Sequence, residues 1–178
     1  GRNNSSAIYW VPAFVVPVFS KTFSVHRETL YVGFAMKIPE YGQSARNNFL
    51  EVLDINTTKM SYALNGDGTI DVWGGEEQTG TRLGNTNCPL HQGCWYYLEF
   101  RNTIHTTSGY IEVRGNGRTE FTFVGNTLFD GSSAQSNRIA FGREESLIGA
   151  NHNFLMDDLY VCDDVGSYNN GFLGDIRV

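Results

Sequence analysis

Apolar and polar residues alternate along many short segments of the chain, which is the pattern of half-buried β-strands. The clearest segment is 29–38, where every second residue is a large apolar one. These residues are Leu30, Val32, Phe34, Met36 and Ile38. The segment 49–55 is apolar on both faces, so it is predicted to be a central strand. Further strands are predicted at 60–64, 69–73, 95–100, 109–114, 119–124, 138–142 and 154–162.

Glycine and asparagine separate these segments where the chain must reverse direction. Asn65–Gly68 and Gly115–Gly117 contain the Asn-Gly and Asp-Gly pairs that tight hairpin turns favour. No segment has a helical period, and no stretch repeats at a fixed spacing. Many short strands joined by turns predict an all-β fold, an antiparallel β-sandwich of the jelly-roll type.

The composition also favours an all-β fold. The 178 residues include 20 Gly and 16 Asn but only 8 Ala and 3 Lys. Gly and Asn favour turns, whereas Ala and Lys favour helix interiors. The length suits one domain, so we expect residues 1–178 to form a single jelly-roll domain. Because the sequence begins at Gly1 and stops inside a predicted new strand at 172–178, we expect it to be part of a longer chain.

Negative charge is concentrated towards the C-terminal end. The formal net charge is −6; residues 144–178 hold seven acids and one base, whereas 1–143 hold twelve of each sign. We interpret the acidic end as a solvated face, with a cation site or a partner surface as alternatives. Binding to nucleic acid or to an anionic membrane depends on clustered Lys and Arg, so neither partner is predicted. No run of about 20 apolar residues is present, so no membrane-spanning helix is predicted.

The order of these pieces resembles a laminin G-like, concanavalin A-like jelly-roll domain. Gly1–Trp10 is similar to its opening strand, Cys94–Phe100 to its strand that begins near a Trp, and Gly109–Gly117 to its hairpin. Met156–Asp163 resembles its closing strand with two adjacent acids. The segment 157–178 also resembles the end of this domain in virion proteins of tailed bacteriophages. The resemblance covers nearly the whole chain.

The resemblance implies a non-enzymatic structural module on the surface of a virion, in capsid decoration, a head fibre or a tail or spike component. Its partners would be other virion proteins and further copies of the same chain, since unpaired strand edges favour association. The alternative is a lectin domain that binds cell-surface glycans for host recognition, and a glycan hydrolase is the third hypothesis. Trp10, Trp73 and Trp95 would stack on sugar rings if exposed, although such residues are more often buried.

Two carboxylates in one predicted strand are the nearest match to the site of the glucanases in this superfamily. Such enzymes need two carboxylates facing one cleft, about 5 Å apart for retention or roughly 6.5–9.5 Å apart for inversion. Glu51 and Asp54 are three residues apart, so a regular strand sends them to opposite faces. Asn56 occupies the place of a second Glu, and the four His form no known catalytic pattern. We therefore predict no enzymatic activity.

The segment Asn65–Asp71 superficially resembles the middle of a calcium-binding loop. A complete loop needs an oxygen ligand at its first position and a bidentate Glu at its twelfth. Aligned on Gly68, these positions hold Ala63 and Gly74, so a hairpin turn is predicted instead. A calcium site built from loops distant in sequence, as lectins of this superfamily often have, stays open.

Cys88, His91 and Cys94 are spaced like zinc ligands, but a structural zinc site needs four ligands and no fourth is near in sequence. We expect free thiols first, a disulfide between Cys88 and Cys94 formed in released particles second, and zinc third. Cys162 is predicted to be a small residue within a strand. No phosphate-binding glycine loop with its Lys is present, so no cofactor is predicted.

Asp157 lies among apolar residues in the predicted strand 154–162. Alternation places it on one face with Leu155, Leu159 and Val161, which we interpret as the inner face, and places Asp158 on the other. An acid among core residues must accept hydrogen bonds. We therefore predict that Asp157 is a structural clamp for a crossing loop, with a metal ligand or a catalytic acid as the alternative.

Overall fold

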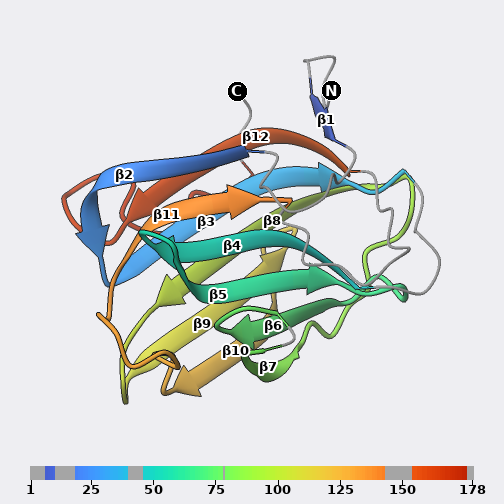
Figure 1. Cartoon of the computed structure of the whole chain (residues 1–178). Helices are drawn as coiled ribbons and strands as arrows, with labels where there is room; N and C mark the ends of the chain where they lie inside the picture. Colours follow the sequence, from blue (N-terminus) through green and yellow to red (C-terminus); the bar gives the residue numbers. More distant parts are fainter. Residues whose placement is uncertain (1–6, 11–18, 40–45, 78, 143–153, 176–178) are drawn as a thin grey trace.

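The computed structural model of the chain describes residues 7–10, 19–39, 46–77, 79–142 and 154–175, which form strands and no helix (Figure 1). The strands make two antiparallel sheets of six strands each, which lie face to face. In spatial order, sheet A contains β1 (Ile8–Trp10), β12 (Phe154–Asp163), β3 (Thr29–Lys37), β8 (Trp95–Thr103), β9 (Gly109–Gly115) and β10 (Arg118–Gly125). Sheet B contains β2 (Phe19–Arg27), β11 (Ser136–Phe141), β4 (Asn47–Asp54), β5 (Thr57–Leu64), β6 (Ile70–Gly74) and β7 (Thr81–Asn85). The predicted antiparallel sandwich is confirmed.

One apolar core joins the two sheets. Phe34 on β3 lies near its centre, where its ring stacks on Phe100 of β8 with centroids 5.7 Å apart. The same ring meets Phe141 of β11 edge-on at 5.2 Å. Phe34 and Phe100 belong to sheet A and Phe141 to sheet B, so the Phe34–Phe141 contact joins one sheet to the other. Full burial of a Phe side chain stabilises the fold by roughly 1.5–3 kcal/mol.

The connectivity mixes neighbours in sequence with neighbours that are far apart. Strands β4 to β7 follow one another across sheet B, and β8 to β10 do so across sheet A. The two late strands lie between early ones: β12 is placed between β1 and β3, and β11 between β2 and β4 (Figure 1).

The two predicted hairpin turns are confirmed. In the β9–β10 turn, Asn116 and Gly117 have φ values of 51° and 78°, the left-handed conformation that a tight turn of this kind requires. In the β5–β6 turn, Gly68 has a φ of 87°, and Asp67 Oδ1 accepts a hydrogen bond from the N–H of Thr69 at 2.9 Å. Asp67 therefore stabilises the turn locally.

The sequence analysis missed two strands, β2 and β7, both at the edges of sheet B. Along β2, Phe19 and Phe23 pack on the core while most of the residues between them are exposed, so the alternation is weak. The predicted new strand at 172–178 is not formed at residues 172–175, and 176–178 lie outside the described residues. The first six residues of the predicted opening strand lie outside them as well.

A β-bulge in β12 reverses the predicted facing of its two acids. Asp157 pairs with Ala35, but the next pair joins Tyr160 to Gly33, so β12 contains one extra residue, and Asp158 there has a φ of 53°. Ala35 and Gly33 alternate with the core residues of β3, and Asp157 therefore points outward, whereas Asp158 is only 6% exposed. The predicted inner position of Asp157 is wrong because the extra residue shifts the alternation by one. Asp157 Oδ1 accepts the N–H of Asp158 at 3.0 Å; its role as a clamp for a crossing loop stays a prediction.

Candidate functional site

The outer face of sheet B carries a continuous set of polar and aromatic side chains. Residues directly opposite each other in paired strands share a face. Glu51 on β4 opposes Ser61, Ser61 opposes Trp73 on β6, and Trp73 opposes Arg82 on β7. We call this surface the sheet B face. Its polar and aromatic members are Asn48, Glu51, Ser61, Asp71, Trp73, Arg82 and Arg138.

Asp71 is the buried carboxylate at the β6–β7 side of the sheet B face. The guanidinium of Arg82 donates to both of its oxygens, at 2.9 Å and 3.1 Å, and Asn65 Nδ2 donates to Oδ1 at 2.9 Å. The hydrogen bond to Asp71 raises the pKa of Arg82 above its usual value. Arg46 Nη1 lies 3.6 Å from Asp71 Oδ2. A buried carboxylate is costly without such partners, so this pairing fixes Asp71 as an acceptor.

Trp73 lies beside this ion pair and is half-buried. The guanidinium carbon of Arg46 lies over its ring, 5.2 Å from the centroid. The indole Nε1 is buried and has no hydrogen-bond partner. Asn48 Oδ1 and Arg138 Nε on the same face are also buried without a partner. Buried polar atoms of this kind are rare in folded proteins, and a bound ligand or water is a common reason for them.

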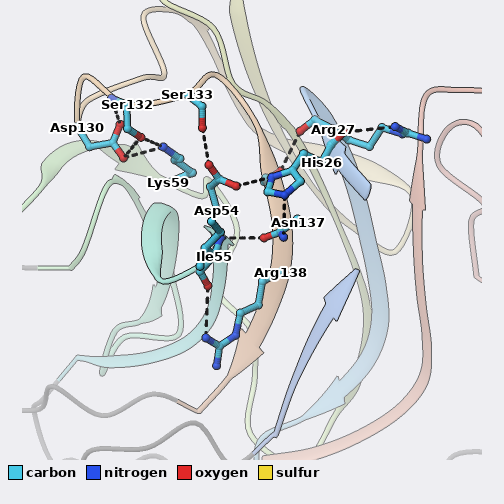
Figure 2. Close-up of polar contacts among 11 residues, drawn as sticks. His26, Arg27, Asp54, Ile55, Lys59, Asp130, Ser132, Ser133, Asn137 and Arg138 are labelled. Carbon is cyan, nitrogen blue, oxygen red and sulfur yellow. Dashed lines mark hydrogen bonds and ion pairs between the residues drawn. The ribbon is translucent and has the colours of Figure 1, made fainter. Parts of the chain in front are cut away.

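The two carboxylates considered for glycoside hydrolysis have different partners. Glu51 is buried on the sheet B face, where its Oε1 accepts a hydrogen bond from Asn48 Nδ2 at 3.0 Å. Asp54 lies at the end of β4, where its Oδ1 is 2.7 Å from His26 Nδ1 and its Oδ2 accepts the hydroxyl of Ser133 (Figure 2). The absence of hydrolytic activity stays a prediction.

His26, Asp54 and Ser133 contain the residue types of a catalytic triad without its arrangement. In a triad, the serine hydroxyl bonds to the histidine nitrogen that faces away from the carboxylate. Here Ser133 donates to Asp54, and His26 Nε2 lies 3.3 Å from the side-chain amide of Asn137 instead (Figure 2). This network therefore supports the β4–β5 turn rather than activating a nucleophile.

The cysteines and the described acidic residues form no assembled metal centre. Cys88 and Cys94 are exposed free thiols, and Cys162 is a half-buried one. Burial raises the pKa of the Cys162 thiol to about 11. Within the described residues, no group of three or more His, Cys, Asp or Glu is placed to hold a metal ion. The Cys88–Cys94 disulfide stays a prediction.

The outer face of sheet A is covered by a segment near the C-terminal end of the chain. An apolar cluster there contains Tyr31, Ala35, Tyr97 and Tyr160, with Trp95, Cys162, Phe172 and Leu173 packed against it. We call this surface the sheet A face. Trp95 packs on this outer cluster rather than in the main core. Within the described residues, no helix is long and apolar enough to cross a membrane.

No protein-family model matches the sequence, and no curated protein matches it. Solved structures do match. An endo-β-1,4-glucuronan lyase from Trichoderma reesei is 12% identical, with a TM-score of 0.56 over 90% of this chain and 88% of that chain. A sialidase is 16% identical, with a TM-score of 0.59, and a carbohydrate binding module, CBM66 from Bacillus subtilis, is 5% identical, with a TM-score of 0.51.

The shares of these chains that are covered differ greatly. The matches cover 80% of this chain but 14% of the sialidase, and 86% of this chain and 94% of CBM66. An alginate lyase of polysaccharide lyase family 7, 17% identical with a TM-score of 0.53, is matched over 76% of this chain and 62% of its own length. Identities this low establish the fold alone. The chain is therefore an antiparallel sandwich of the jelly-roll, concanavalin A-like type.

Proposed function

We propose that the protein binds carbohydrate through the sheet B face and has no enzymatic activity. The observation that carries this proposal is the group of buried polar atoms without partners on that face. They belong to Trp73, Asn48 and Arg138, so the group includes two donors and one acceptor. A ligand that both donates and accepts hydrogen bonds could therefore satisfy the donors and the acceptor at this face.

Sugars fit this combination of groups better than most ligands do. Each hydroxyl both donates and accepts, so it serves an indole N–H or a guanidinium N–H as well as an amide oxygen. The apolar face of a sugar ring also packs on an aromatic side chain such as Trp73. Arg82, whose side chain is 48% exposed, adds an accessible donor at the edge of the face.

The solved structures that share the fold support the same proposal. Among those named above, one is a carbohydrate binding module, and three are named as a sialidase or as lyases of glucuronan or alginate. None of those four is named as a virion protein. The virion role and a location on a particle surface therefore stay predictions without this support, as do other virion proteins and further copies of the chain as partners.

The absence of catalysis is supported by the partners of the acids on the sheet B face. A general acid must hold a proton that it can give to the leaving group. Asp71 accepts hydrogen bonds from Arg82 and Asn65. Glu51 accepts a hydrogen bond from Asn48. Both carboxylates therefore serve as acceptors in the proposed site.

Binding to a panel of soluble polysaccharides, measured by affinity electrophoresis and calorimetry, tests the proposal. We expect at least one ligand, and at least tenfold weaker binding after Trp73→Ala or Arg82→Ala. Trp95→Ala and Arg101→Ala are matched controls, because these residues lie on the outer side of sheet A. Equal losses in both pairs of variants, or binding by none of the proteins, would contradict the proposal.

Activity is tested separately on every polysaccharide that binds. We expect neither release of reducing ends nor ultraviolet absorbance from an unsaturated product. Turnover above that of a Glu51→Gln variant would show that the protein is an enzyme.

A further inference from the structure

A second candidate site is an open pocket of about 390 Å³ at the end of sheet B where β4 turns into β5. Its walls come from three separate segments: 56–58 at the start of β5, 74–76 with 79–80 between β6 and β7, and 129–130 before β11. The volume is near the lower end of the range for small-molecule sites, which suits one or two small rings.

The rim of the pocket is held in an unfavourable backbone conformation. Ile55 precedes the lining residue Asn56 and has a φ of 57°, which is rare for a β-branched residue, and its side chain is 60% exposed. Asn137 Oδ1 accepts the N–H of Ile55 at 2.8 Å (Figure 2). Arg138 Nη1 donates to Asn56 Oδ1 at 3.0 Å. Strained residues that the surrounding structure holds in place are concentrated at ligand sites. The fold therefore maintains an exposed apolar side chain beside the pocket.

The floor of the pocket depends on glycine. Phe129 packs directly on Gly74, where a Cβ atom would lie 1.9 Å from its ring. A Cβ atom on Gly80 would lie 2.3 Å from the carbonyl oxygen of Gly74. Larger residues at these positions would displace the loop or the ring. The glycines thus bring backbone and an aromatic ring together beside the space that a ligand would fill.

The pocket is lined by carboxylates and hydroxyl groups, and its described lining contains no Lys, Arg or His. Asp130 contributes a carboxylate, which Lys59 Nζ contacts at 2.7 Å (Figure 2). The side chain of Lys59 is only 1% exposed. Burial raises the pKa of Asp130, but hydrogen bonds from Lys59 and Ser132 outweigh this and hold it below its usual value. Glu76 contributes the second carboxylate. The lining itself therefore presents acids to an anionic ligand, and the two cations that contact it are each engaged, Lys59 with Asp130 and Arg138 with Asn56.

We propose that this pocket is a second sugar site that accepts a neutral sugar ring and rejects acidic sugars. The threonine hydroxyls and carboxylates of the lining match ring hydroxyls, and Phe129 supplies an apolar contact, with the exposed Ile55 next to the lining residue Asn56. The lining differs in charge from the sheet B face, on which the side chain of Arg82 is 48% exposed. The proposal concerns a different set of residues, so it stands or falls independently of binding at the sheet B face.

Two-dimensional nuclear magnetic resonance with methyl glucoside, methyl galactoside and methyl glucuronide tests this proposal, with the Gly75 and Gly80 amides as reporters. We expect a neutral glycoside to shift these resonances at millimolar concentration and the glucuronide to leave them unchanged. Thr79→Trp fills the pocket and should weaken binding at least tenfold. Thr81→Trp is the matched control, because Thr81 is equally exposed but does not line the pocket, and it should change binding less than twofold. Arg82→Ala, which tests the sheet B face, should leave these shifts intact.

Two further variants probe the charge and the strain. Glu76→Gln should narrow the difference in binding affinity between the neutral glycoside and the glucuronide. Ile55→Asn should raise the melting temperature, because Asn tolerates positive φ, yet weaken sugar binding several-fold. Equal binding of glucoside and glucuronide, equal effects of Thr79→Trp and Thr81→Trp, or no shift of the reporters with any glycoside would each overturn the proposal.

Discussion

The outer faces of the two sheets use the same classes of residue in opposite ways. On the sheet A face, Glu99 accepts the hydroxyl of Tyr160 at 2.7 Å and the N–H of Gly174 at 2.8 Å, and the Arg114 guanidinium carbon lies 3.9 Å from the centre of the Phe172 ring. Two of these contacts therefore come from Phe172 and Gly174, in the segment that covers the sheet A face. On the sheet B face, Trp73 Nε1 is buried without a partner.

Under the proposed function, this difference separates stability, on the sheet A face, from recognition, on the sheet B face. The sheet A face stabilises the fold, because its carboxylate, arginine and aromatic rings contact one another and the covering segment. The same groups left with unsatisfied atoms are available to a ligand. We therefore expect substitutions on the sheet A face to change the free energy of unfolding, and substitutions on the sheet B face to change binding.

The largest effect is expected from Glu99→Ala. Glu99 is buried, and its loss leaves the Tyr160 hydroxyl and the Gly174 N–H without an acceptor, so the free energy of unfolding should fall by about 2–3 kcal/mol. Urea denaturation measures the change. Asp71→Ala is the matched control on the sheet B face, where the half-exposed Arg82 can reach water, and it should cost at most about 1 kcal/mol. If Asp71→Ala lowered the free energy of unfolding more than Glu99→Ala does, the comparison between the two faces would be contradicted.

Alkaline pH should destabilise the protein through the sheet A face. Burial, and then the hydrogen bond to Glu99, raise the pKa of Tyr160 well above its usual value of 10.0. The unfolded chain therefore loses this proton at lower pH than the folded one does, so stability is complete below about pH 10 and falls as the pH rises further. Unfolding measured from pH 9 to 11.5 should show this decline. Tyr160→Phe should make it shallower without abolishing it, because burial also raises the pKa of Tyr62; an unchanged slope would argue against the role of Tyr160.

The β12 bulge provides a smaller effect on the stability of sheet A. Asp158 has positive φ, and placing Ala in that conformation costs roughly 1–2 kcal/mol. Asp158→Ala should therefore lower the melting temperature more than Asp157→Ala does, which is opposite to the order that the sequence alone suggested. Asp158→Gly should be milder than Asp158→Ala, since Gly adopts this φ freely. Equal shifts for Asp157→Ala and Asp158→Ala would show that the bulge is not sensitive to the residue placed there.

The smallest effect concerns thiol reactivity and leaves the stability almost unchanged. Cys162 Sγ lies 3.3 Å from the carbonyl oxygen of Gly171, and burial raises its pKa to about 11, so it should react with iodoacetamide far more slowly than Cys88 and Cys94. Phe172→Ala should speed the reaction at Cys162 and leave the other two rates unchanged. Mass spectrometry after timed labelling measures all three rates. Fast labelling of Cys162 in the unchanged protein would show that the covering segment does not protect the sheet A face.

The parts of the fold that sequence patterns predicted are those with strong local signals. The alternation at Leu30–Ile38 and the turns at Asn65–Gly68 and Gly115–Gly117 depend on residues close together in the chain. The edge strand β2 buries few side chains, so its pattern was too weak to recognise. The bulge at Asp158 was also missed, because one extra residue in a strand leaves no mark on composition or spacing.

The candidate site was harder to predict than the fold. Trp73 was considered as a residue that stacks on sugars, but Arg46 and Arg82 were not connected with it, because they reach it from a loop and from a strand that the pattern missed. Glu51 was singled out for catalysis, and the structure places it on the sheet B face with Asn48 as partner. The pocket at 56–58, 74–76, 79–80 and 129–130 is built from segments that are distant in sequence, and the pairing of the strands brings them together.

The placement of β11 and β12 between earlier strands has a consequence for how the chain folds. Neither sheet can be completed until β11 and β12 are available, because within the described part of the chain β2 pairs with β11 and β1 with β12 and neither has another partner. Chains dominated by such long-range pairings fold slowly, because long loops must close, at a cost in entropy, before the stabilising contacts between distant strands can form. During synthesis, the edges of β3 and β4 that await these partners are exposed to other unfinished chains. Fragments that end before residue 136 should therefore aggregate, whereas addition of a separate 136–175 segment should rescue them.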